Sequence, residues 1–180
     1  NITSVGTLTS LTVSGATSIT GNSAFTVTNI TTGANTTVGY LTGNWTLTTG
    51  SRMQATYADL AEYYAGDEQI EPGTVVEFGG QHEVHICNSY MSTLVAGIVT
   101  TDPAYIMNAN INCEYPVAIA LQGRIPAKVI GPVRRGDMMV SANNGYAISC
   151  KSPVMGTVLG KALTNFEGDA GIIEIMVGRT

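Results

Sequence analysis

Apolar and polar residues follow different patterns in two parts of the chain. In residues 1–50 the apolar residues come in short alternating bursts separated by Gly and Asn. The bursts lie at residues 10–15, 24–29, 36–43 and 44–50. Alternation with a period of two indicates short strands, and 16 threonines in these 50 residues disfavour a helix. A loose [LF]-T-V-[ST] repeat, at residues 11–14 and 25–28, is typical of a stacked fibre.

Each of these bursts carries too few large apolar side chains to form a core within one chain. Ordering the backbone costs ~1–2 kcal/mol per residue, which two or three apolar side chains per burst do not offset. Identical copies packed around a three-fold axis would cover the apolar faces. The pattern therefore predicts an elongated trimeric β-fibre shaft, β-helix-like or β-prism-like, with a Thr/Ser/Gly linker as the alternative.

From Pro72 onward the pattern predicts nine strands bounded by turn residues, at 74–78, 83–87, 95–100, 117–122, 125–130, 138–142, 146–149, 157–163 and 172–177. Tight turns are expected at Asn143-Asn144-Gly145 and at Gly136-Asp137. Strands at this spacing predict an all-β domain over residues 72–180, folded as a compact β-barrel or β-sandwich.

The stretch YADLAEYYAGDEQIE (57–71) joins these two parts. Ala58 to Tyr64 is the one segment that reads as helical, with Asp59 near its N-terminal end, where a carboxylate is favoured. We therefore expect three parts in the chain: a Thr-rich β shaft (1–50), a junction with a short helix (51–71) and an all-β tip (72–180).

Charge divides the chain at the same place. All 13 acidic and all 8 basic residues lie between Arg52 and Arg179, and the net charge is −5. An acidic chain lacks the basic face that duplex nucleic acid requires. No run approaches the ~20 apolar residues of a membrane span, so we expect a soluble protein without membrane insertion. The start at Asn1, without Met, predicts a fragment or a processed product.

Motifs for enzymatic chemistry or cofactor binding are missing from the sequence. It has no GxSxG, HExxH or GxxxxGK[ST]. Cys87, Cys113 and Cys150 form no CxxC pair, which favours buried free thiols over a zinc site. His82 and His85 are expected on opposite faces of a strand. Four Asn-x-Thr triplets, at residues 1, 29, 35 and 44, keep a glycosylated eukaryotic adhesin open as a further class.

Two motifs carry a family resemblance, YADLAE (57–62) and GRIPAKVIGPVRRGDMMVS (123–141). With the segments around them, they make residues 57–179 resemble a C-terminal domain of tail-fibre and appendage proteins of tailed phages. The resemblance is strongest to the intramolecular-chaperone, self-processing domain of neck-appendage proteins. It implies a virion-located homotrimer, with two identical chains and other tail or baseplate proteins as partners, that presents a distal tip to the host.

Self-processing members of this family cut a Ser-Asp bond and carry a Glu three residues after the Asp. Carried over by the resemblance, Asp59 and Glu62 match the two carboxylates, whereas Ala58 replaces the Ser. A mechanism that needs a hydroxyl nucleophile has none at this position. We therefore expect a structural, non-enzymatic module, with an autoprotease that cleaves Ala58-Asp59 as the alternative.

Host attachment predicts a surface for glycan. Sugars bind through aromatic faces and nearby polar groups, which the shaft does not offer. Tyr90, beside Asn88, and Tyr105, near Asn108, are the candidate receptor-binding residues, within the loops at 88–93 and 104–114. Their alternative role is packing against a neighbouring chain.

Overall fold

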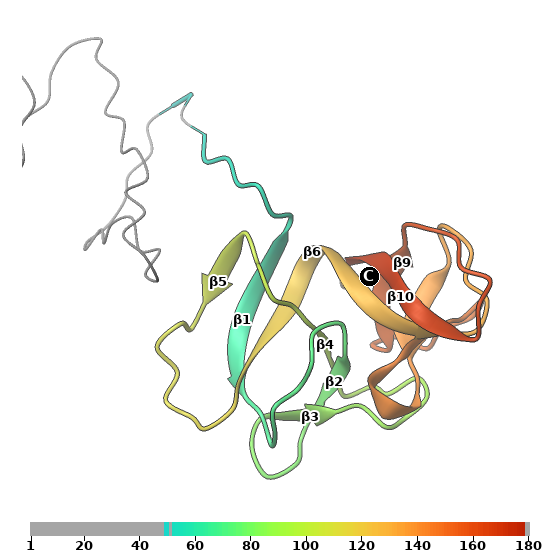
Figure 1. Ribbon diagram of the computed structural model, residues 1–180, viewed down its shortest axis with the longest axis horizontal. Helices are drawn as coiled ribbons and strands as arrows, with labels where there is room; N and C mark the ends of the chain where they lie inside the picture. The colour runs from blue at the N-terminus through green and yellow to red at the C-terminus, as the bar shows by residue number, and fades with distance from the viewer. Residues whose placement is uncertain (1–48, 51, 179–180) are drawn as a thin grey trace, which may run out of the picture. The chain divides into compact units, whose positions relative to one another are not determined.

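The computed structural model describes residues 49–50 and 52–178. The predicted shaft strands, the [LF]-T-V-[ST] repeat and the four Asn-x-Thr triplets lie outside these residues, apart from the last two residues of the shaft. The contacts divide the chain into two compact units, Asn1–Ser51 and Arg52–Thr180. The second unit is described below (Figure 1).

This unit is built from ten strands and one short 3-10 turn. They are β1 (Asp59–Ala65), β2 (Val75–Phe78), β3 (Val84–Ile86), β4 (Val95–Val99), β5 (Tyr105–Met107), β6 (Pro116–Ile130), β7 (Met138–Ser141), η1 (Asn143–Gly145), β8 (Ala147–Ser149), β9 (Val158–Ala162) and β10 (Ala170–Val177). The described part is therefore all-β, as the alternating pattern predicted.

Strand β6 is the centre of the fold. It is 15 residues long, and both of its halves are paired. Its first half pairs antiparallel with β1, from Pro116 opposite Ala65 to Gly123 opposite Asp59. Its second half pairs antiparallel with β10 from Gly123 onward. The sequence predicted two strands here, 117–122 and 125–130, but the chain continues through the residues between them.

Five strands close into a barrel. Around the ring, β6 pairs with β8, β8 with β7, β7 with β9, β9 with β10, and β10 with β6 again. Inward side chains alternate with outward ones along each strand, so the inward set forms one core. Its large members include Ile125, Val129, Met139, Leu159, Ile173 and Ile175. Of the two predicted architectures, the barrel is the one present.

A smaller sheet extends this barrel. Strand β4 pairs with β6, β2 pairs with β4, and β3 pairs with β2. A second apolar core lies here, and Tyr64 of β1 packs against it. The Tyr64 ring also meets Phe78 edge-on, with centroids 5.8 Å apart. The members of this core are Ile70, Val76, Val84, Ala96, Val99, Val117 and Ile119.

The short helix expected at Ala58 to Tyr64 was wrong. These residues lie almost entirely in β1, which pairs with β6 on one side and with the parallel strand β5 on the other. Pairing along both edges satisfies the backbone of β1, and this outweighs the local helical preference of Ala, Leu and Glu. Figure 1 shows β1 between β5 and β6.

Both predicted turns are present. Asn144 has φ 58° and Gly145 has φ 71°, the left-handed conformation expected of Asn and Gly in a tight turn. At the other turn, the Asp137 amide donates to the Arg134 carbonyl oxygen at 3.0 Å. No helix in the described residues is long and apolar enough to cross a membrane.

Candidate functional site

Asp59 lies at the first position of β1 and is buried, with 5% of its surface exposed. Its backbone is held from both sides. The Arg124 amide donates to the Ala58 carbonyl oxygen at 3.3 Å, and the Ala104 amide donates to the Asp59 carbonyl oxygen at 2.8 Å. Among the described residues, Asp59 Oδ2 is the only buried side-chain oxygen or nitrogen atom without a hydrogen-bond partner. Since a buried carboxylate normally finds donors, this atom marks a candidate site.

Gly123 allows β6 to approach this backbone closely. A Cβ at this position would lie 2.1 Å from the Ala58 carbonyl oxygen and 2.6 Å from Asp59 Cα. The residue also has φ +116°, a conformation that residues with a side chain rarely adopt. Position 123 therefore requires Gly if the Ala58-Asp59 peptide is to stay where it lies.

Glu62 does not join Asp59. Successive side chains of a strand point to opposite faces, so residues three apart lie on opposite sides. The register between β1 and β6 shifts after Leu60, because Leu121 of β6 has no partner residue in β1. The extra residue is in β6, so the alternation of side chains along β1 stays intact. Glu62 instead accepts a hydrogen bond from the Tyr64 hydroxyl at 2.9 Å. The expectation that Asp59 and Glu62 share one face of a helix was wrong because the segment is a strand.

A second polar cluster, centred on Glu77, was missed by the sequence analysis. Glu77 is 6% exposed, and its Oε2 accepts hydrogen bonds from Ser92 Oγ at 2.5 Å and Cys87 Sγ at 3.4 Å. The Asn88 amide donates to Oε1 at 3.4 Å, and His85 Nε2 lies 4.0 Å from the same oxygen. A carboxylate within the apolar run TVVEF was the one signal that could have revealed this cluster.

The donors around Glu77 decide its ionisation. Burial raises the pKa of Glu77. Hydrogen bonds from Ser92, Cys87 and Asn88, together with the nearby His85, lower the pKa by more than burial raises it, so the net pKa is below its usual value. Burial also raises the pKa of the Cys87 thiol. The cluster therefore holds a carboxylate that is stabilised as the anion beside a neutral thiol.

Hydrogen bonds from the barrel extend this cluster. Ser141 of β7 donates from Oγ to the Ser89 carbonyl oxygen at 2.9 Å and accepts from the Ser92 amide at 2.9 Å. Since each buried polar atom here has a partner, the arrangement clamps the β3–β4 connection onto β7.

The two candidate receptor-binding tyrosines are both exposed. Tyr90 is 58% exposed, and its hydroxyl donates to Cys150 Sγ at 3.7 Å. Tyr105 is 56% exposed and lies in β5 opposite Leu60 of β1. Tyr90 lies in the connection between β3 and β4, whereas Tyr105 lies in β5, so the two tyrosines come from different elements.

The cysteines and histidines have separate surroundings. The three thiols are free: Cys87 is buried as predicted, whereas Cys113 and Cys150 are half-buried. His82 Nδ1 lies 3.1 Å from Asp67 Oδ1, whereas His85 lies near Glu77. Within residues 49–50 and 52–178, no three His, Cys, Asp or Glu residues gather as metal ligands would.

Solved structures include similar folds. Over 71% of this chain, the fold is similar to part of the pre-mature gene product 12 of bacteriophage phi29, with a TM-score of 0.52 and 13% sequence identity. The chain spans about a quarter of that protein, because the match covers 23% of it. A second match is the N base of the phi29 head fibre protein gp8.5. The alignment covers 67% of this chain and 94% of that protein's chain, at 10% identity. Its TM-score of 0.41 is too low to carry an argument.

Comparisons with protein-family models and with curated proteins gave no match. At 13% identity, the likeness to gene product 12 shows a shared fold and no more. The described unit therefore has the fold of a segment of a phage protein.

Proposed function

We propose that this chain is a structural component of a phage fibre or appendage, which assembles as a homotrimer and presents its β-barrel unit as a tip toward the host. The observation that carries the proposal is the fold that this unit shares with part of phi29 gene product 12, at a TM-score of 0.52. The YADLAE and GRIPAKVIGPVRRGDMMVS motifs lie in β1 and along β6 and β7, the strands that build that fold.

The surroundings of the Ala58-Asp59 bond favour a role without catalysis. Ala58 has no hydroxyl to attack a carbonyl carbon, and Glu62 lies on the face of β1 opposite Asp59. In this proposal the YADLAE segment pairs with β5 on one side and with β6 on the other. This pairing holds the start of the folded unit in place against β6. Its carboxylates have no chemical step to perform.

Locating the chain on native particles of its source phage would test this proposal. Antibodies raised against the folded unit should label an appendage of intact virions in electron micrographs. Antibodies against a capsid protein of the same phage serve as the control. Labelling only of lysate proteins outside the particle would overturn the structural role.

Self-cleavage at Ala58-Asp59 is the second candidate, and the unpartnered Asp59 Oδ2 favours it. Asp59 places a carboxylate beside this peptide bond, and its Oδ2 accepts no hydrogen bond in the structure. Intact mass under denaturing conditions separates the two candidates. The structural proposal predicts the whole chain, whereas self-cleavage predicts a fragment that begins at Asp59.

A further inference from the structure

The outer face of the barrel alternates methionines with cations. Four residues lie side by side across four strands: Arg124 of β6 is opposite Met176 of β10, which is opposite Lys161 of β9, which is opposite Met138 of β7. All four are exposed, and Met176 is 54% and Met138 is 38% exposed. We call this row of four residues the cationic-methionine face.

Charge on this face is only partly compensated within the chain. Arg124 Nη1 lies 3.5 Å from Glu174 Oε2, and both side chains are about half exposed. Lys161 has no ion pair among the residues that the structure describes. Large apolar side chains with cations at their borders are typical of a protein interface, because the apolar atoms gain from burial and the charges select the partner.

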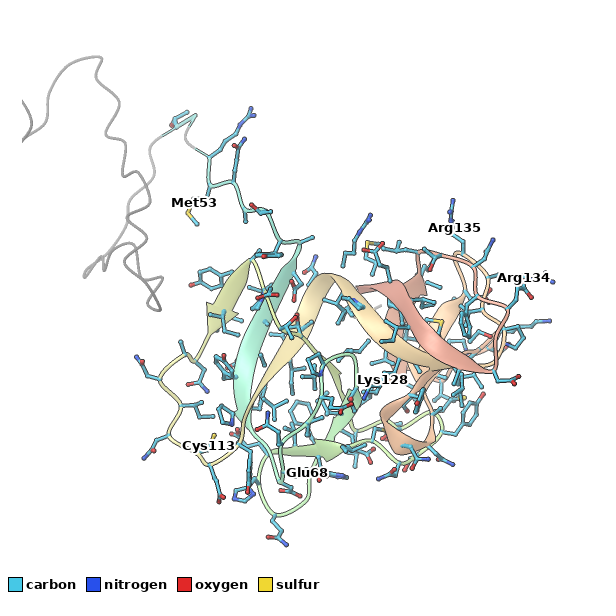
Figure 2. All side chains as sticks on the ribbon, in the orientation of Figure 1. Met53, Glu68, Cys113, Lys128, Arg134 and Arg135 are labelled. Carbon is cyan, nitrogen blue, oxygen red and sulfur yellow. The ribbon has the colours of Figure 1, made fainter. Side chains whose placement is uncertain are left out.

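The opposite charge is concentrated elsewhere in the same chain. Residues 59–114 contain nine acidic residues and no Lys or Arg, whereas six of the eight basic residues lie at 124–161. In Figure 2, Glu68 lies at the lower edge of the unit and the Arg134–Arg135 pair lies at its upper right. The acidic and basic residues are therefore concentrated in different segments of the chain, although 124–178 also contains Asp137, Glu167, Asp169 and Glu174.

Backbone pairing brings together the segments that carry four acidic residues. The Asp67 amide donates to β3 at 3.1 Å, and Glu83 Oε2 accepts from the last amide of β1 at 2.8 Å. The Gly66 amide donates to the carbonyl of the residue after Glu114 at 2.8 Å. We call Asp67, Glu68, Glu83 and Glu114 the acidic end.

We propose that the cationic-methionine face docks against the acidic end of a second copy of this chain. The two surfaces lie on different parts of one unit, so the contact is head-to-tail, and a three-fold axis would close three copies into a ring. The proposal rests on the homotrimer of the proposed function and assigns the surfaces that would join its tips. Complementary charge selects this partner, since like surfaces of two copies repel each other.

Charge reversal in the full chain tests this docking. Lys161→Glu places an acid opposite the acidic end, and Glu68→Lys places a cation opposite the cationic-methionine face. We expect each change alone to weaken association about tenfold or more, measured by sedimentation velocity across a dilution series. The double variant Lys161→Glu/Glu68→Lys restores opposite charges at these two positions and should regain part of the association that each single variant loses.

Control changes use exposed residues that belong to neither surface. Arg52→Glu and Asp102→Lys make charge reversals of the same size and should leave association unchanged. Added salt should weaken the wild-type assembly, because exposed charges are screened within ~8 Å at physiological ionic strength.

The outcomes separate this inference from the proposed function. A trimer that persists in both single variants would overturn the docking and leave the homotrimer intact. A wild-type chain that stays monomeric would overturn both. Loss of binding to an anionic host polymer in Lys161→Glu, with association unchanged, would instead assign the face to that polymer and overturn the docking.

Discussion

Replacing Gly123 with Ala should detach β1 from β6. The new Cβ would lie 2.1 Å from the Ala58 carbonyl oxygen, whereas carbon and oxygen atoms in contact are ~3.3–3.6 Å apart. The backbones must therefore separate by about 1 Å, which disturbs the hydrogen bond from the Arg124 amide to Ala58. The Ala-Asp peptide that begins β1 would lose its position.

Two costs contribute to the loss of stability. A residue with a side chain at φ +116° stores ~1–3 kcal/mol of backbone strain. Forcing a methyl group into occupied space costs a further ~1–3 kcal/mol. Their sum, ~2–6 kcal/mol, is a large part of the ~5–15 kcal/mol by which proteins of this kind are stable.

Gly131→Ala is the matched control. Gly131 also has a positive φ, +71°, but a Cβ there would meet no atom within 4 Å. Its cost is backbone strain alone, ~1–2 kcal/mol. The free energy of unfolding is measured by urea denaturation of the full chain, at one protein concentration for all variants, with far-UV circular dichroism. Equal losses in the two variants would refute the close approach of β6 to the start of β1.

The remaining predictions concern ionisation, cleavage and attachment. The folded state lowers the pKa of Glu77 below its usual 4.5, so its contribution to stability is present above that pH and is lost as the pH falls through the folded-state pKa. Glu77→Gln should therefore flatten the fall of the unfolding free energy below pH 4.5, and an unchanged acid titration would contradict the cluster. Ala58→Ser supplies a hydroxyl but leaves Glu62 on the far face of β1, so intact mass should still give the whole chain; a new fragment starting at Asp59 would show that the nucleophile was the only missing part. If the tip binds glycan, adsorption of the full chain to host cells should fall when Tyr90 and Tyr105 are both replaced by Ala, and full adsorption by the double variant would remove both residues from that role.

The strands of the barrel could be predicted because each one is marked by a pattern of nearby residues in the sequence. In β10 and β7, apolar residues alternate with polar ones or are bounded by turn residues, and the turn at Asn144 carries its own chemistry. Patterns of this kind depend on neighbours in the sequence. The sequence therefore predicted the fold class and most strand positions.

Elements that depend on distant partners could not be predicted in this way. The composition of Ala58 to Tyr64 favours a helix, and only pairing with β5 and β6 makes it a strand. The continuity of β6 depends on Gly123, which reads locally as a break between two strands. The cluster at Glu77 gathers donors from 10 to 15 residues away in the chain, so no short motif reveals it.

Native mass spectrometry of the full chain tests the central claim most directly, namely that this is an intact, trimerising structural module. The account predicts a complex of three chains, each with the full mass of 18.8 kDa when the complex is dissociated. A folded monomer, or a complex that contains a fragment starting at Asp59, would contradict it.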